Sequence, residues 1–172
     1  MIALSDTPTL RTERLVLRAP LGSDWPHWRA FHTDMRAQWI GGAKGADGAW
    51  RAFGHVIGHW AMRGFGSFVF HRQGDPTPIG MCGPWFPEGW PETEIGWTLW
   101  SGAHEGKGFA TEAARTTMAF ARDRLGWHSA VSYIHPDNAA SMAVAVRLGA
   151  TRDETAARPH ANDVVYRHWG MP

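Results

Sequence analysis

Two glycines separated by one residue, Gly106 and Gly108, stand between a predicted strand near residues 92–100 and a segment whose small residues recur at helical spacing. Glycine lets the backbone adopt positive φ and approach a ligand closely, because it has no Cβ atom. The first N–H groups of a helix lack intrahelical partners, and the helix dipole makes that end positive. The sequence therefore predicts a loop that holds an anion such as a diphosphate at a helix N-terminus, with Lys107 adding charge.

Other phosphate-binding loops fit this segment poorly. Counted from Gly102, the Gly-Lys pair lies one residue short of Walker A spacing, and Gly108 stands where a magnesium-binding Ser or Thr is needed. A dinucleotide fingerprint would need a third glycine where Thr111 stands. ATP hydrolysis and dinucleotide binding are therefore disfavoured.

Carboxylates precede the loop on the same extended segment. By strand alternation, Glu92, Glu94 and Thr98 share one face. A carboxylate beside a buried Trp97 or Trp100 would have a raised pKa and would take up a proton near neutrality. A solvated glutamate at the end of a strand is the alternative interpretation.

Three segments together resemble the GNAT acetyltransferase superfamily. Glu105-Gly-Lys-Gly-Phe-Ala110 is similar to its acyl-CoA pyrophosphate loop, Gln/Arg-x-x-Gly-x-Gly/Ala. Thr12-Glu-Arg-Leu-Val-Leu-Arg18 resembles the first strand of the subgroup that includes the ribosomal-protein-alanine N-acetyltransferases, and Ile134-His-Pro-Asp-Asn-Ala-Ala-Ser-Met142 resembles its second CoA-contacting segment. Glu105 departs from the family pattern. We expect its charge to weaken CoA binding without abolishing it, because backbone amides hold most of the diphosphate.

The expected fold is α/β (α+β), in a single acetyltransferase domain over residues 1–172. Periodicity and turn residues predict strands near 13–19, 66–72, 77–83, 92–100, 128–134, 151–154 and 162–168, and helices near 23–33, 46–63, 108–124 and 138–148. These make a mixed sheet of about seven strands with helices on both faces. The resemblance implies a GNAT-like, mostly antiparallel sheet that splays between strands four and five, where the pantetheine arm would lie.

The resemblance also implies that acetyl-CoA is the co-substrate. Backbone groups of the strand before the loop would pair with pantetheine and offer an N–H to the thioester oxygen, although ordinary strand pairing is the alternative. Asn138 resembles the family's CoA-contacting asparagine, but Asp137 or Asn138 would also make a good helix N-cap. The predicted cofactor-binding residues are Trp97, Thr98, Leu99, Glu105, Gly106, Lys107, Gly108, Phe109, Ala110, Thr111, Asn138 and Ser141.

The implied reaction is transfer of the acetyl group to a primary amine, which attacks the thioester directly. Glu94 is the first choice for the base, since it lies eleven residues before Glu105, as in several family members. Glu92 or a chain of waters are the alternatives. The last helix lacks the tyrosine that often protonates the thiolate in this superfamily, so we assign that role to Ser141, with Tyr133 as the weaker candidate.

Eleven tryptophans are the most unusual feature of the composition. Trp85, Phe86 and Trp90 fall on the hairpin that overhangs the acceptor side in the family, and with Glu92 they form the predicted substrate-binding set. An aromatic wall there would suit cation–π contact with an amine. Core or rim packing is the alternative for most tryptophans. The acceptor is expected to be a protein N-terminus or a small-molecule amine, and the alternative function is a non-catalytic acyl-CoA-binding sensor module.

Composition limits the remaining possibilities. A net charge of +1 gives no electrostatic footprint for nucleic acid or an acidic membrane surface. No apolar run reaches membrane-spanning length and the first residues lack signal-peptide character, so we expect a cytoplasmic protein, with a homodimer plausible for this superfamily. Cys82 is the only cysteine, which leaves no internal disulfide. His55 and His59 lie one helical turn apart without a third ligand, so no metal is expected.

Overall fold

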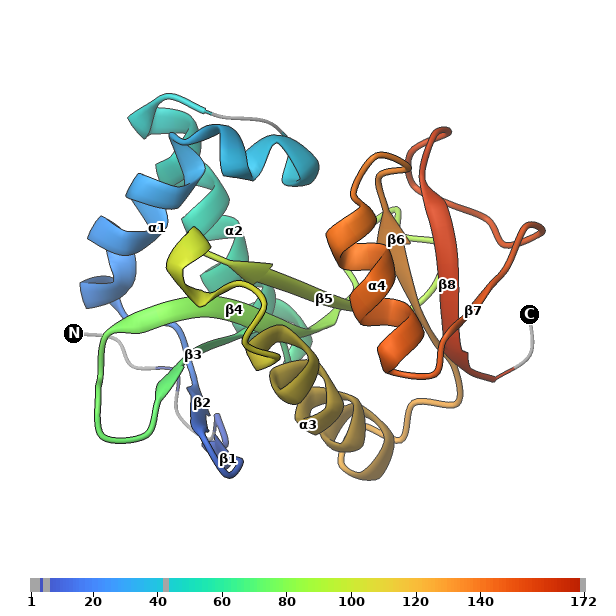
Figure 1. Cartoon of the computed structure of the whole chain (residues 1–172), viewed down its shortest axis with the longest axis horizontal. Helices are drawn as coiled ribbons and strands as arrows, with labels where there is room; N and C mark the ends of the chain where they lie inside the picture. Colours follow the sequence, from blue (N-terminus) through green and yellow to red (C-terminus); the bar gives the residue numbers. More distant parts are fainter. Residues whose placement is uncertain (1–3, 5–6, 42–43, 171–172) are drawn as a thin grey trace.

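The computed structural model describes residue 4, residues 7–41 and residues 44–170, and within them it contains an eight-stranded mixed sheet (Figure 1). The strand order is β1-β2-β3-β4-β5-β6-β8-β7, and every neighbouring pair is antiparallel except β5 and β6. The strands are β1 (Leu10–Arg11), β2 (Leu15–Arg18), β3 (Phe68–Arg72), β4 (Pro78–Trp85), β5 (Glu94–Leu99), β6 (Ala130–Ile134), β7 (Thr151–Arg152) and β8 (Val164–Trp169). The mostly antiparallel mixed sheet is therefore confirmed. The additional strand, β1, is only two residues long, too short to show alternation.

Helices cover both faces of the sheet, as predicted. In Figure 1, α1 and α2 lie on one side of the central strands, and α3 and α4 lie on the other. The helices are α1 (Trp25–His32), α2 (Ala46–Arg63), α3 (Phe109–Asp123) and α4 (Ala139–Arg147), with the short 3-10 segments η1 (Gly22–Asp24), η2 (Met35–Ile40) and η3 (Gly102–His104). The sequence analysis missed η2. None of the described helices is both long and apolar enough to cross a membrane.

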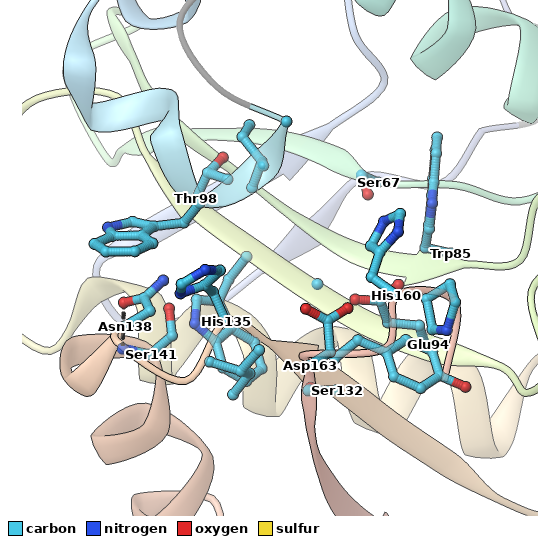
Figure 2. Close-up of a pocket in the computed structure, with 18 of the residues that line it drawn as sticks. Ser67, Trp85, Glu94, Thr98, Ser132, His135, Asn138, Ser141, His160 and Asp163 are labelled. Carbon is cyan, nitrogen blue, oxygen red and sulfur yellow. Dashed lines mark hydrogen bonds between the residues drawn. The ribbon is translucent and has the colours of Figure 1, made fainter. Parts of the chain in front are cut away.

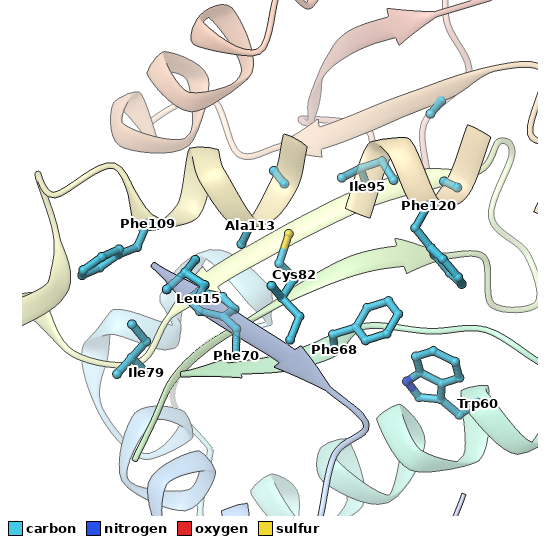
Figure 3. Close-up of a cluster of buried hydrophobic side chains, with 14 residues drawn as sticks. Leu15, Trp60, Phe68, Phe70, Ile79, Cys82, Ile95, Phe109, Ala113 and Phe120 are labelled. Carbon is cyan, nitrogen blue, oxygen red and sulfur yellow. The ribbon is translucent and has the colours of Figure 1, made fainter. Parts of the chain in front are cut away.

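Strand alternation divides the core into two layers. Phe68 and Phe70 belong to the cluster that includes residues of α3, whereas Val69 joins the cluster made with α1 and α2. Figure 3 shows Phe120 of α3 near Phe68 in the first cluster. Cys82 is fully buried in the same layer, and burial raises the pKa of its thiol to about 12. Because both faces of the central strands are apolar, the strands that carry the site are held from both sides.

The sheet divides between β5 and β6. Their only register pair in the described part of the chain joins Glu94 to Val131, where the Val131 N–H donates to the Thr93 carbonyl oxygen at 3.0 Å. One residue further on, the Ser132 hydroxyl donates to the Ile95 carbonyl oxygen at 2.6 Å. These two strands correspond to strands four and five of the sequence analysis, so the predicted splay is confirmed.

Strand β4 lies so close to β5 that one position accepts no side chain. A Cβ atom on Gly80 would lie closer than 3.0 Å to the Thr98 backbone oxygen and to the Phe70 ring. We expect Gly80→Ala to lower the free energy of unfolding by about 1–3 kcal/mol, because a buried strand cannot move aside cheaply. Gly54→Ala is the control, since nothing lies within 4 Å of its Cβ position. In the interior of α2 this change should stabilise by about 0.5–1 kcal/mol. Urea unfolding measures both, and a Gly80→Ala protein as stable as wild type would contradict the close packing.

Candidate active site

The glycine loop ends at the N-terminus of α3. Gly106 has φ of +70° and Gly108 has φ of +79°, a region in which side chains are strained. Gly108 is the N-cap, and the Glu112 N–H makes the first helical hydrogen bond, to the Gly108 carbonyl oxygen at 3.0 Å. The N–H groups at the start of α3 therefore have no partner within the helix. A helix N-terminus of this kind is where the sequence analysis expects an anion to bind.

Arg14 holds this loop against the first strands. Its Nε donates to Glu112 at 2.7 Å, its Nη1 donates to the Lys107 carbonyl oxygen at 3.0 Å, and its guanidinium lies 4.8 Å from the centre of the Phe109 ring. Burial acts to raise the pKa of Glu112, but hydrogen bonds from Thr12 and Arg14 outweigh it, and the pKa is lowered. Arg14 thus fastens the glycine loop and the start of α3 to the N-terminal strands, although the two segments are widely separated in the sequence.

A cavity of about 810 Å³, here called the loop cavity, begins at this helix end. All of the predicted cofactor-binding residues except Lys107 line it, and it is completed by residues of η2 and α4. Lys107 instead contributes its carbonyl oxygen to the contact with Arg14. The lining of the loop cavity includes Arg36, Trp97, Thr98, Leu99, Glu105, Gly106, Gly108, Phe109, Ala110, Thr111, Asn138 and Ser141.

Backbone groups of β5 face the division of the sheet. The carbonyl oxygen of Ile95 accepts a hydrogen bond from the β6 side, whereas the Trp100 N–H donates to the carbonyl oxygen of Ile79 on β4. Along a strand, successive residues direct their N–H and C=O groups to alternate sides. Trp97 and Leu99 therefore direct theirs toward the slot, where the strands have diverged and β6 no longer pairs with them.

A second cavity of about 700 Å³, here called the carboxylate cavity, lies along the same strand. Figure 2 shows Glu94, Asp163 and His160 toward one end of it and Asn138 and Ser141 toward the other. The Trp90 indole N–H donates to a Glu94 carboxylate oxygen at 2.6 Å.

The predicted substrate-binding residues divide into two pairs. Trp85 and Trp90 line the carboxylate cavity, but Phe86 and Glu92 do not. The Phe86 ring packs under the Arg63 guanidinium at 5.3 Å. Glu92 accepts two hydrogen bonds from the buried Arg167, at 2.8 and 2.9 Å. It precedes β5, so strand alternation does not bring it beside Glu94.

Burial gives Glu94 unusual proton affinity. It raises the pKa of Glu94 to about 7, against hydrogen bonds from Trp90 and the Tyr133 backbone, and the negative charge of Asp163 acts in the same direction as burial. The pKa of Asp163 is also raised by burial, although His160, His135 and Arg158 oppose the shift. The cavity therefore holds two carboxylates that each retain a proton more readily than in water.

Tyr133 also lines the carboxylate cavity. Its hydroxyl is buried and has no hydrogen-bond partner among the described residues. Burial raises the pKa of this group to about 12, with further contributions from Glu92 and Glu94. The hydroxyl thus stays protonated and can donate to a group that enters the cavity.

The two cavities meet beside β5 and α4. Trp97, Thr98, Asn138 and Ser141 line both of them. Asn138 is the N-cap of α4, because its side-chain oxygen accepts a hydrogen bond from the Ser141 N–H at 3.1 Å. The predicted N-cap role of Asn138 is therefore confirmed, and the same residue lines both cavities at their junction. A group bound at the junction would contact residues from both sides of the slot.

Sequence reasoning missed Asp163, His160 and Arg36. Asp163 and His160 lie in the segment between β7 and β8, where Arg158 Nη1 donates to the Asp163 carbonyl oxygen at 3.0 Å. The polar run before the last strand was the only available signal. Arg36 lies on η2, which the sequence analysis did not predict.

The two histidines considered for a metal have other contacts, and the His55 ring lies 5.0 Å from the Trp85 ring. His59 Nδ1 bonds the Phe65 carbonyl oxygen at 2.8 Å, and the Phe86 N–H donates to His59 Nε2 at 3.0 Å. These two hydrogen bonds require a neutral His59 ring with its proton on Nδ1. The His59 ring also stacks on the Trp85 ring. Within the described ranges, no group of three or more His, Cys, Asp or Glu side chains gathers as a metal would need.

A helix end with free N–H groups, a divided sheet and a carboxylate beside the slot are the features that the resemblance to an acyltransferase implied. The chain belongs to the GNAT acetyltransferase family, because the model of the GNAT acetyltransferase domain matches residues 14–151. A crystal structure of an acetyltransferase from Agrobacterium tumefaciens str. C58 is 39% identical, with 93% of each chain covered and a TM-score of 0.88. The predicted superfamily is confirmed.

Two further solved structures share the fold at lower identity. RimL, a ribosomal L7/L12 alpha-N-protein acetyltransferase solved in complex with coenzyme A, is 19% identical over 95% of this chain and 98% of that one, with a TM-score of 0.74. A ribosomal-protein-S5-alanine acetyltransferase from Vibrio fischeri is 16% identical over 93% and 94%, with a TM-score of 0.67. The structural neighbours thus include the predicted subgroup.

The raised pKa of Glu94 predicts a pH-dependent stability. In the folded protein Glu94 holds its proton up to a pH of about 7, whereas in the unfolded chain it loses it near 4.5. The folded state thus binds more protons across this window, and its stability falls as pH rises through it. Glu94→Gln should remove that loss, so its advantage over wild type should grow between pH 4.5 and 8 by at most about 3 kcal/mol.

Denaturant unfolding at several pH values measures this difference. Glu88→Gln, whose side chain is fully exposed, reports the effect of removing a surface carboxylate. A Glu94→Gln advantage that stays constant with pH would contradict the burial of this carboxylate.

Proposed function

We propose that the protein transfers the acetyl group of acetyl-CoA to a primary amine, and that residues 1–172 form a single acetyltransferase domain. The observation that carries this proposal is the meeting of the two cavities. One cavity contains the free N–H groups at the start of α3, and the other contains a carboxylate whose pKa is about 7. Family membership supports acetyl transfer independently.

The loop cavity is the proposed site of acetyl-CoA. Its diphosphate would bind the N–H groups of Phe109, Ala110 and Thr111, where the helix dipole stabilises negative charge. Its pantetheine arm would pair with the backbone of Trp97 and Leu99. The thioester would then lie at the junction of the cavities, and an N–H from this strand would stabilise the oxyanion that forms on attack.

The carboxylate cavity is the proposed site of the acceptor amine. Two carboxylates attract an ammonium group, and Trp85 and Trp90 provide aromatic surface beside them. Glu94 would accept the proton that the amine must lose. Asp163, absent from the sequence-based assignment, would share the binding of the cation. Tyr133 lines this cavity and not the loop cavity, which favours contact with the acceptor over protonation of the thiolate.

The proton affinity of Glu94 favours an α-amine as acceptor. An α-ammonium group has a pKa of about 8, so transfer of its proton to a base with a pKa of about 7 costs roughly 1.4 kcal/mol. An alkylammonium group such as that of lysine has a pKa of about 10.4, and the same step costs roughly 5 kcal/mol. A protein N-terminus or a small molecule with an α-amino group therefore fits this base best.

Ser141 is the proposed donor of the proton to the departing thiolate. It lines both cavities, so a thioester bound at their junction would bring its sulfur near this hydroxyl. Because a thiolate is a stable leaving group, we assign this residue a smaller share of the rate than the base.

Ligand-dependent stability tests the cofactor half of the proposal. Acetyl-CoA at 100 times its Kd should stabilise the folded protein by about 2.7 kcal/mol, whereas ATP and NAD should leave thermal unfolding unchanged. Release of CoA in the presence of α-amino compounds would then identify the acceptor. Binding without CoA release over a broad panel of amines would favour the sensor function, and no stabilisation by acetyl-CoA of protein free of bound CoA would contradict both functions.

Substitution of the base tests the catalytic half. Glu94→Gln should lower kcat by about 10²–10⁴-fold with the Kd for acetyl-CoA unchanged. Because the ionised carboxylate is the active form, wild-type kcat/KM should fall as pH decreases through about 7, and this dependence should disappear in the variant.

Glu92→Gln is the matched control, because it removes a nearby carboxylate that is bound to Arg167 outside the cavity. It should lower stability and preserve the pH profile. Full activity in Glu94→Gln would show that water or another group takes the proton.

A further inference from the structure

An ion pair lies in the lining of the loop cavity. The Arg36 guanidinium, on η2, donates to the Glu105 carboxylate, immediately before Gly106. Both residues line the loop cavity, together with the first residues of α3. Glu105 is the residue that departs from the Gln or Arg of the family loop. The structure therefore brings a cation from another element to the position where the sequence pattern lacks one.

Local structure holds Arg36 at this place. Asp34 caps η2 by accepting a hydrogen bond from the Arg36 N–H at 2.8 Å, and Gly41, with φ of +102°, ends it. Arg36 Nη1 lies 3.0 Å from the position that a Cβ on Gly102 would occupy. The absence of a side chain at Gly102 therefore leaves room for the guanidinium.

Arg36 has donor capacity beyond the bond to Glu105. Its Nε is buried and has no hydrogen-bond partner among the described residues. A guanidinium carries five N–H donors in a planar fork, which matches the oxygens of a phosphate. The Glu105 side chain is 56% exposed, so water stabilises this carboxylate when its partner leaves.

A diphosphate at the start of α3 would enter the same cavity as Glu105. Two anions there would repel each other, and both would attract the Arg36 guanidinium, which lies between η2 and the loop. The diphosphate offers more oxygens and is also held by the helix end, so it is the stronger competitor.

We propose that Arg36 binds the diphosphate of CoA and that Glu105 is an internal competitor which holds Arg36 until the cofactor displaces it. This inference rests on the proposed function, because it requires acetyl-CoA in the loop cavity. It assigns opposite effects to the two members of one ion pair: Arg36 strengthens cofactor binding, and Glu105 weakens it.

Isothermal titration with acetyl-CoA tests the proposal through the direction of each change. Arg36→Gln should raise the Kd by about tenfold or more, because charge-assisted hydrogen bonds to the diphosphate are lost. Glu105→Gln should lower the Kd by about threefold or more, because the competitor and its charge are removed. In the Arg36→Gln background the same Glu105→Gln change should lower the Kd by a smaller factor than in wild type, because only the charge repulsion and no longer the competition is removed.

Two controls separate this role from a structural one. Arg51→Gln and Asp47→Asn break an exposed ion pair on α2 that lies outside both cavities, and neither should change the Kd. S-acetylpantetheine lacks the diphosphate, so displacement titration should give it the same affinity for wild type and Arg36→Gln.

The possible outcomes are distinct. If the ion pair only fastens η2 to the loop, both single variants should weaken binding of acetyl-CoA and S-acetylpantetheine alike, and that result would overturn the proposal. An unchanged Kd in Arg36→Gln, or an equal or higher Kd in Glu105→Gln, would also overturn it. Failure of wild type to bind acetyl-CoA would contradict the proposed function itself.

Discussion

The divergence of β5 from β6 is the constraint on which the site depends. The strands pair at Glu94 and Val131, and the Ser132 hydroxyl makes one more link to Ile95. Because Ser132 donates to a carbonyl oxygen, His168 Nε2, at 2.8 Å, must be the donor to the Ser132 oxygen. Burial lowers the pKa of His168 to about 4, which keeps this ring neutral. The strands separate beyond this link, and both cavities lie along the exposed edge of β5.

The surroundings of the carboxylates determine what each can do. Glu112 and Glu92 accept hydrogen bonds from Arg14 and Arg167, and these contacts fix the loop and the end of the sheet. Glu94 instead accepts from an indole N–H in a buried setting, so its pKa rises toward neutrality. Three glutamates of the same intrinsic acidity thus differ in function because only one lacks a cationic partner. This contrast supports Glu94 as the base more strongly than its spacing in the sequence does.

Much of the fold followed from periodicity and glycine positions, because α2 is a long amphipathic helix capped by glycine at both ends and α3 is a long amphipathic helix that begins at Gly108. The residues of the loop cavity that lie in and around the glycine loop could be predicted from the sequence, because that loop is a local pattern. Those of the carboxylate cavity could not all be predicted, because Asp163 comes near Glu94 only through the packing of the β7–β8 segment. Phe86 and Glu92 were predicted from hairpin position and alternation, but neither lines the cavity, since Arg63 and Arg167 hold them elsewhere. Contacts between distant segments leave no periodic signal.

The most direct test of the proposed cofactor site is a crystal structure of the protein with acetyl-CoA. The diphosphate is expected on the N–H groups of Phe109, Ala110 and Thr111. The pantetheine arm is expected in the slot between β5 and β6, with the thioester oxygen within hydrogen-bond distance of a backbone N–H of Trp97 or Leu99. Acetyl-CoA bound outside the slot, or a thioester remote from the junction of the two cavities, would contradict the proposed site.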